Sequence, residues 1–343
     1  MLSLIFKDGA MGDAILLFIF GLILLIKGGD WFVDGATGIA KRFRIPDILI
    51  GATVVSIGTT LPEVMVSATG AASGQGAMAY GNAIGSIICN TALIAAITIA
   101  IKPASVERKT LIIPVCFFFG SAIFYSLIAI VAQEFARWVG ILLLAVFVIY
   151  MAFTIYKAFS SPERKQSDEL LNPDEKQEES DDEEKQSPLW KDLLFLVLGA
   201  GLIAVGADLL VNKGTYIAKA WGVPETVIAL TFVALGTSLP ELVTAITSLI
   251  KGRGALSLGN LIGANLFNLV LVSGIAVTIA PFSVPLGKLV GGLNASLVID
   301  IPVMLGVMAI LTIPTLIRGK LSKLQGYALL AIYVAYVTLQ FVL

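Results

Sequence analysis

Residues 58–63 read Gly-Thr-Thr-Leu-Pro-Glu, and residues 236–241 read Gly-Thr-Ser-Leu-Pro-Glu. The two copies stand 178 residues apart, and the match continues at that offset without a gap from Asp30 to Asn90. Roughly 24 of the 61 positions are identical, which is far more than unrelated segments share. The chain is therefore built from two repeated halves, and the stretches that match best are polar.

The composition of the chain is that of a membrane protein. Of its 343 residues 57% are apolar and 14% are charged, whereas about 25% are charged in a soluble domain. Apolar runs near twenty residues long, such as Leu111–Val131 and Val139–Tyr156, match the length that a helix needs to cross a bilayer. These runs are continuous rather than alternating, which favours helices over a barrel. We predict an all-α integral membrane protein with ten transmembrane helices, centred near residues 24, 58, 90, 120, 147, 203, 236, 268, 304 and 332.

The ten predicted spans divide equally between the halves. An odd number of spans in each half makes the second half enter the membrane from the opposite side, so we predict two inverted five-helix repeats, as in many transporters. The first repeat is residues 1–159, with its motif at about 51–95, and the second is residues 189–343, with its motif at about 229–273. A duplication that only enlarged the bundle is the alternative, which the polar character of the matched stretches disfavours.

Residues 160–188 separate the two repeats. Ser160–Ser187 holds eleven acidic and four basic residues, a net charge of −7, and almost no apolar side chains that could form a core. A solvated linker is the favoured interpretation of such an acidic run, and a calcium-sensing segment around Asp181–Glu184 is the alternative.

Basic residues collect on one side of the membrane when the loops are numbered alternately. Lys41–Arg44, Lys102–Lys109 and Arg318–Lys323 fall on the same side as the acidic linker. The positive-inside rule makes this side cytoplasmic, so we predict a multi-pass protein of the plasma membrane with both termini outside. No basic cluster points to nucleic acid, and the sequence indicates no obligate protein partner.

Each copy of the first motif places a proline in mid-span. A proline removes one helix hydrogen bond, so Pro62 and Pro240 predict helix breaks next to Gly58 and Gly236. Free carbonyls are tolerated at membrane depth only where they line protein or water, and they are the hard oxygen donors that Na⁺ and Ca²⁺ bind. The donor set predicted from this motif comprises the carbonyls around Ser56–Gly58 and Ala234–Gly236, the hydroxyls of Thr60 and Ser238, and the carboxylates of Glu63 and Glu241.

The two glutamates need a partner, because a carboxylate at membrane depth costs about 2.5 kcal/mol or more. No Lys or Arg lies at matching depth in both halves, since Lys27 has no counterpart in the second half. A bound cation is the simplest partner, and protonated, hydrogen-bonded structural glutamates are the alternative. For a third intramembrane acid, Asp300 beside Pro302, the structural interpretation is favoured.

The second motif begins with Gly-Asn in both halves, at residues 81–90 and 259–268. Its glycines lie one helical turn apart and predict a close approach of another helix; they are Gly81, Gly85, Gly259 and Gly263. Ser86 and Asn90 also lie one turn apart and face the same way, and Asn90 and Asn268 supply carbonyl oxygens. For Asn82 and Asn260, cation ligation and interhelical hydrogen bonding both remain open.

These paired motifs resemble the two α-repeats of the calcium/cation antiporter superfamily, and in particular its prokaryotic sodium/calcium exchanger branch. The resemblance covers about residues 28–100 and 206–278. It implies that Glu63 and Glu241 bind Ca²⁺ together with backbone oxygens near Thr59 and Thr237. It also implies that Asn90 and Asn268 face the same cavity, and that flanking Na⁺ sites use Thr60, Ser238, Ser86 and the carbonyls of Ser56 and Ala234. The first and sixth spans, residues 14–40 and 193–219, would then slide as a gate.

The expected function is an electrogenic, potassium-independent exchange of Na⁺ for Ca²⁺ by alternating access, with the ions as cargo and no cofactor. Asn268 stands where potassium-dependent relatives carry an acid, and Ala264 stands opposite Ser86, so one hydroxyl is missing from the second half. The alternatives are a proton-coupled Ca²⁺/cation antiporter and a cation channel. We expect no enzyme, because the chain shows no nucleophile–base pair, no histidine and no phosphate-binding loop.

Overall fold

The computed structural model describes residues 11–43, 45–103, 106, 108–159, 188–222, 236–286 and 289–342. Eight of its helices are long and apolar enough to cross a membrane. They are Met11–Phe43 (α1), Asp47–Ala72, Gly76–Ile101, Arg108–Val131 (α6), Arg137–Lys157, Leu189–Ala220 (α9), Gly254–Ile279 and Ser296–Arg318. The shorter helix α11 (Leu239–Ile250) and the C-terminal helix α15 (Lys323–Val342) lie in the regions of the two remaining predicted spans. An all-helical membrane protein is therefore confirmed, whereas ten spans in inverted repeats stay a prediction.

Four spans are composite, because a π-helical turn interrupts the α-helix in three of them and begins the fourth. The segments in order are α2 (Asp47–Ile50), η2 (Gly51–Val55) and α3 (Ser56–Ala72); α4 (Gly76–Cys89), η3 (Asn90–Ala95) and α5 (Ala96–Ile101); α12 (Gly254–Phe267), η6 (Asn268–Val272) and α13 (Ser273–Ile279); η7 (Ser296–Asp300) and α14 (Ile301–Arg318). Such wide turns occur often at functional sites. Two of them, η3 and η6, begin at the paired residues Asn90 and Asn268.

Helix α7 (Arg137–Phe159) contains the fifth of these spans, and the short strands lie in connections between spans. Strand β1 (Glu134–Phe135) pairs antiparallel with β2 (Phe282–Ser283), and β3 (Leu289–Val290) pairs antiparallel with β4 (Leu293–Asn294). The first pairing joins a connection of the first half to one of the second, so the halves are also linked outside the helices.

The polar spans lie at the centre of the bundle. The apolar window of Gly254–Ile279 is 78% buried inside the protein, and that of Gly76–Ile101 is 72% buried. The corresponding values are only 22% for α1 and 28% for α9. The spans Gly76–Ile101 and Gly254–Ile279, which carry the second motif, are therefore surrounded by protein, and α1 and α9 lie at the periphery.

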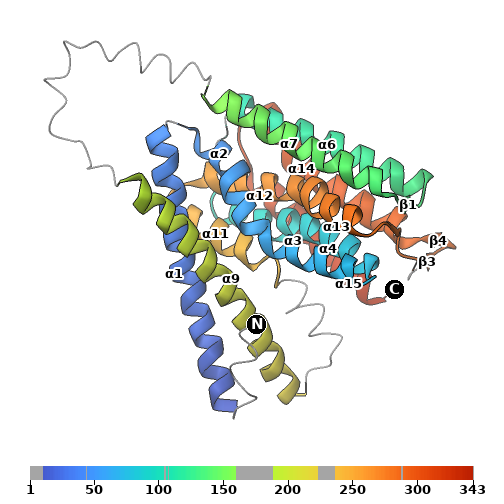
Figure 1. Ribbon diagram of the computed structural model, residues 1–343, viewed down its shortest axis with the longest axis horizontal. Coiled ribbons are helices and arrows are strands. Elements are labelled where there is room, and N and C mark those ends of the chain that lie inside the picture. The colour runs from blue at the N-terminus through green and yellow to red at the C-terminus, as the bar shows by residue number, and fades with distance from the viewer. Residues whose placement is uncertain are drawn as a thin grey trace, which may run out of the picture.

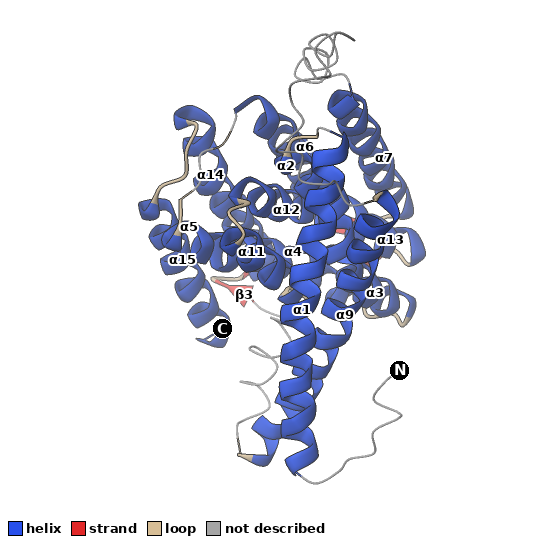
Figure 2. Cartoon of the chain, turned by 90° about the vertical axis from the view of Figure 1, so that its left-hand side faces the viewer, coloured by secondary structure: helices blue, strands red, loops and turns tan. Residues whose placement is uncertain are grey.

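Helices α1 and α9 run side by side along one edge of the bundle and project beyond the other helices (Figures 1 and 2). Glycines seven residues apart line their contact: Gly21, Gly28 and Gly35 on α1, and Gly199 and Gly206 on α9. A Cβ added at any of them would lie 3.0 Å or closer to a backbone atom of the other helix. Small residues at such a spacing allow two membrane helices to touch backbone to backbone. We call this contact the glycine seam.

Polar contacts attach α1 to the end of α11. The Lys251 Nζ atom donates to the Asp34 carboxylate at 2.7 Å and lies 3.6 Å from the Asp30 carboxylate. Gly29 of α1 faces Val243 and Thr247 of α11, where it leaves no room for a side chain. The long helix pair is therefore attached to α11 both by an ion pair and by close packing.

Candidate cation site

The two motif glutamates lie inside the protein on neighbouring helices. Glu63 is carried by α3 and Glu241 by α11, and both side chains are fully buried. Helices α3 and α11 contact each other. The fold thus brings together two acids that are 178 residues apart in the sequence.

Six of the residues predicted to bind cations carry buried polar atoms without a hydrogen-bond partner within the described residues. These are Thr60 Oγ1, both oxygens of Glu63, both amide atoms of Asn90, Ser238 Oγ, both oxygens of Glu241, and both amide atoms of Asn268. Eight of these ten atoms are oxygens. Burial of a polar group is unfavourable unless it finds a partner, so this set is suited to hold a ligand that supplies only positive charge.

The π-helical turns place each asparagine against the other half of the chain. The turn η3, which begins at Asn90, contacts α11, the helix of Glu241. The turn η6, which begins at Asn268, contacts α3, the helix of Glu63. The candidate site is therefore shared reciprocally, because each half supplies the amide that lies beside the carboxylate helix of the other half.

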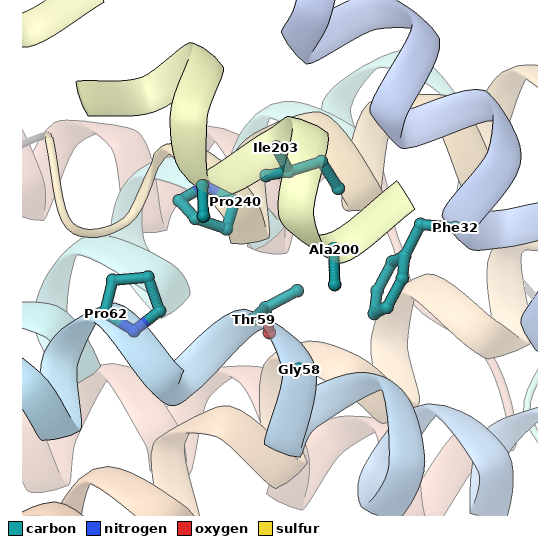
Figure 3. Close-up of a pocket in the computed structure, with 8 residues that line it drawn as sticks. Phe32, Gly58, Thr59, Pro62, Ala200, Ile203 and Pro240 are labelled. Atoms are coloured by element: carbon teal, nitrogen blue, oxygen red, sulfur yellow. The ribbon is translucent and has the colours of Figure 1, made fainter. Parts of the chain in front are cut away.

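A small cavity separates the candidate site from the long helix pair (Figure 3). Its volume is about 200 Å³ including its open mouth. Phe32, Ala200, Ile203 and Ala204 line it from α1 and α9, and Gly58, Thr59, Pro62 and Pro240 line it from the two motifs. Both motif prolines thus border one space, against which the long helices pack.

The hydroxyl residues flanking the glutamates differ in their surroundings. Thr59 and Ser86 are buried, whereas Thr237 is half-buried. The Ser56 hydroxyl shares its hydrogen between the Gly51 carbonyl at 2.7 Å and the Asn260 carbonyl at 2.9 Å, and the Thr59 hydroxyl lies 3.4 Å from the Ser56 carbonyl. Ala234, whose carbonyl belongs to the predicted set, lies outside the described residues.

The predicted helix break at Pro62 is wrong. Helix α3 continues through Pro62 to Ala72. Proline is tolerated inside a membrane helix where neighbouring groups compensate for the missing bond, so only the hydrogen bond to the Gly58 carbonyl is lost. Pro240 instead lies in the first turn of α11, and Gly236 lies in the turn before it. The two copies of the motif thus have different backbones.

The glycines of the second motif also differ between the halves. A Cβ on Gly259 would overlap the backbone of Ile48, and one on Gly263 would overlap Ser56 and Ala52. The close helix approach predicted there is present. Nothing among the described residues lies within 4 Å of a Cβ on Gly81 or Gly85. The residues of the second half that correspond to Ile48, Ala52 and Ser56 are at 226–234, outside the described residues. The close helix approach predicted for Gly81 and Gly85 therefore stays untested.

Two buried hydroxyl residues near the site lie outside both sequence motifs and were not predicted from the sequence. Thr244 and Ser248 follow Glu241 on the same face of α11 and are fully buried, without hydrogen-bond partners for their hydroxyls in the described chain. Their spacing of three and seven residues from the glutamate is the sequence signal that points to a shared face. Asp300 instead accepts hydrogen bonds from Tyr336 at 3.0 Å and Gln340 at 2.8 Å, which agrees with a structural role.

The charge of the candidate site comes from its two carboxylates. Within the described residues, no group of three or more His, Cys, Asp or Glu side chains gathers that could hold a tightly bound metal ion. The other donors, Thr60, Ser238, Asn90 and Asn268, are neutral. Affinity for Ca²⁺ depends on the number of charged ligands, so a site with two carboxylates suits an ion that must also leave.

Comparisons with known proteins identify the family. The chain matches the family described as "Sodium/calcium exchanger protein" over residues 13–156 and 191–342. It is 34% identical to CaxA from Alkalimonas amylolytica, which carries the provisional name of an antiporter, over 94% of this chain and 96% of that protein. It is 29% identical to the sodium/calcium exchanger MaX1 from Methanosarcina acetivorans over 95% of this chain and 98% of that protein. Its fold matches the solved structure of the sodium-calcium exchanger NCX_Mj with a TM-score of 0.76 and 29% identity, over 95% of this chain and 97% of that chain. The chain therefore belongs to the sodium/calcium exchanger family of membrane antiporters.

Proposed function

We propose that this protein exchanges Na⁺ for Ca²⁺ across the membrane by alternating access. The observation that carries the proposal is the set of eight buried oxygens without hydrogen-bond partners in the described chain, supplied by both halves around Glu63 and Glu241. Oxygen ligands are those that Ca²⁺ and Na⁺ take in proteins. The names of MaX1 and NCX_Mj, both sodium/calcium exchangers, support the same choice of ions.

Within this proposal, Glu63 and Glu241 are the central Ca²⁺ ligands, assisted by backbone oxygens of Thr59 and Thr237. The flanking Na⁺ positions use the hydroxyls of Thr60, Ser238 and Ser86 and the carbonyls of Ser56 and Ala234, and Asn90 and Asn268 complete the cavity. Two carboxylates are neutralised by one Ca²⁺ or by two Na⁺, so the two kinds of ion compete for one site. This competition is what couples their movements.

The proposed architecture is ten spans in two inverted repeats, residues 1–159 and 189–343, with a cytoplasmic linker at 160–188. Both termini lie outside the plasma membrane. The pair α1 and α9, which the glycine seam joins, acts as the sliding gate over the central helices. The cavity between this pair and the two motif prolines is the space into which such a slide opens.

Calcium flux in proteoliposomes tests this function. Purified protein should take up radioactive calcium when an outward Na⁺ gradient is imposed, and not when an equal K⁺ or H⁺ gradient replaces it. Uptake driven only by H⁺ would favour the proton-coupled alternative. Uptake that needs no opposing ion gradient would indicate a channel, and a requirement for K⁺ together with Na⁺ would overturn potassium independence.

The exchange should be electrogenic. A third Na⁺ on the flanking positions would make the sodium-loaded site one charge more positive than the calcium-loaded site. One net charge that crosses 100 mV is worth about 2.3 kcal/mol, so a 100 mV change in clamped potential should shift the final calcium gradient roughly 50-fold. The measurement is calcium accumulation at steady state under a fixed Na⁺ gradient, with the potential set by valinomycin and K⁺. A final gradient that does not depend on voltage would show electroneutral exchange.

A further inference from the structure

Two hydrogen bonds cross between the halves from one motif to the other. The Thr59 hydroxyl donates to the Asn260 amide oxygen at 3.2 Å, and the Thr237 hydroxyl donates to the Asn82 amide oxygen at 3.4 Å. The four residues form two pairs related by the same offset of 178 residues that relates the halves. The contact is therefore reciprocal. Asn260 of the second half binds Thr59, which precedes Glu63 by four residues, and Asn82 of the first half binds Thr237, which precedes Glu241 by four residues.

Asn260 is fixed at both ends. Its side chain is fully buried in α12, and its backbone carbonyl lies 2.9 Å from the Ser56 hydroxyl, whose hydrogen it shares with the Gly51 carbonyl. Gly259 and Gly263 on either side let the α12 backbone lie directly against the segment that leads into α3. The amide of Asn260 is thus placed by backbone packing rather than by a flexible contact, and it can hold Thr59 in one position.

Asn82 connects three groups around the first glutamate. Its amide oxygen accepts from Thr237, and its amide nitrogen donates to the Ser67 hydroxyl at 2.8 Å and to the Glu63 backbone carbonyl at 3.2 Å. The counterpart of Ser67 is Ala245, and the Asn260 amide nitrogen has no partner within the described residues. The hydrogen bonds that Asn82 makes around Glu63 are therefore more numerous than those that Asn260 makes around Glu241.

We propose that Asn82 and Asn260 are positioning residues, which hold the Thr59 and Thr237 turns across the interface of the halves and so set how the two carboxylates face each other. This proposal rests on the proposed function of the same site. Sequence alone left ligation and interhelical bonding open for both residues. The structure favours bonding, because both amide oxygens already accept a hydrogen bond from the opposite half.

A mutant cycle on the Thr59–Asn260 pair tests the proposal in full-length protein. Asn260→Ala and Thr59→Val should each raise the KM for Ca²⁺ roughly tenfold, the order that one buried hydrogen bond supplies, with a smaller change in maximal rate. The double variant should be no worse than either single variant, because both remove the same bond. Thr59→Ser, which keeps the hydroxyl, should recover most of the affinity that Thr59→Val loses. Asn212→Ala is the control, since Asn212 is exposed and, within the described residues, its hydrogen-bond partner is Asp208 of its own helix.

A second measurement separates failure of this proposal from failure of the proposed function. Hydrogen–deuterium exchange of the backbone amides at 56–61, measured without Ca²⁺, should become faster in Asn260→Ala and in Thr59→Val, and not in Asn212→Ala. This readout does not depend on which ion is transported. Additive losses in the double variant, a wild-type KM in either single variant, or unchanged amide exchange would overturn the positioning role. Absence of calcium flux in the wild-type protein would instead overturn the proposed function alone.

Discussion

Glu63→Gln and Glu241→Gln should each reduce sodium-driven calcium flux at least roughly 100-fold. Each substitution keeps the size of the side chain and removes one of the two charges that balance Ca²⁺. A unit charge 4 Å from another contributes about 4 kcal/mol at an effective dielectric constant of 20, and the divalent ion doubles that attraction. Calcium uptake into proteoliposomes under a fixed Na⁺ gradient measures the loss, together with gel filtration to show that the variants stay folded.

Asp300→Asn is the matched control for the glutamate variants. It also neutralises an acid at membrane depth, but Asp300 bonds to Tyr336 and Gln340 of α15 rather than facing the candidate site. We expect it to retain most of the wild-type flux. Wild-type exchange in either glutamine variant would remove that glutamate from the site, and equal losses in all three variants would show a general need for charge in the bundle.

Gly28→Ala should destabilise the protein and slow exchange at least roughly tenfold. The added Cβ would lie 2.8 Å from the backbone nitrogen of Ile203 on α9, so the long helices must move apart. Overpacking of this kind typically costs about 1–3 kcal/mol, and it is relieved least easily where the neighbour is backbone. The measurements are the melting temperature in detergent and the initial rate of calcium uptake.

Gly201→Ala provides the control on the same helix pair. Gly201 lies on α9, and within the described residues no atom lies within 4 Å of a Cβ at this position. Since alanine is the better helix former, this variant should be as stable as the wild type or slightly more so. A Gly28→Ala protein that melts and transports like Gly201→Ala would contradict a backbone-to-backbone seam.

The sequence predicted the features of the fold and of the site that depend on repeated motifs. The duplicated Gly-Thr-x-Leu-Pro-Glu motif located both buried glutamates, and the polar stretches that match between the halves lie in spans at the centre of the bundle. The seven-residue spacing of Gly21, Gly28 and Gly35 was also readable, but it became meaningful only once α9 was seen to lie against α1. A contact between helices far apart in sequence has no local signature.

The backbone conformation of the two motifs could not be predicted from the sequence. Proline chemistry predicted a break at both Pro62 and Pro240, yet the helix continues through the first and starts at the second. Two motifs that differ only at Thr60 and Ser238 thus adopt different backbones, which proline chemistry alone does not predict. The π-helical turns at Asn90 and Asn268 likewise depend on packing across the two halves rather than on propensity.

Because glycine has no side-chain rotamers, docking α1 onto α9 at Gly21, Gly28, Gly199 and Gly206 freezes none, whereas ordering a leucine costs about 0.5–1 kcal/mol of rotamer entropy. Lipid tails are as apolar as leucine, so the hydrophobic effect does not hold two membrane helices together. Dispersion between the two backbones, without an entropic penalty at the contact, therefore carries the association. Such an association is enthalpic, so in the alternating access proposed above we expect the two helices to stay joined while the contacts around them change.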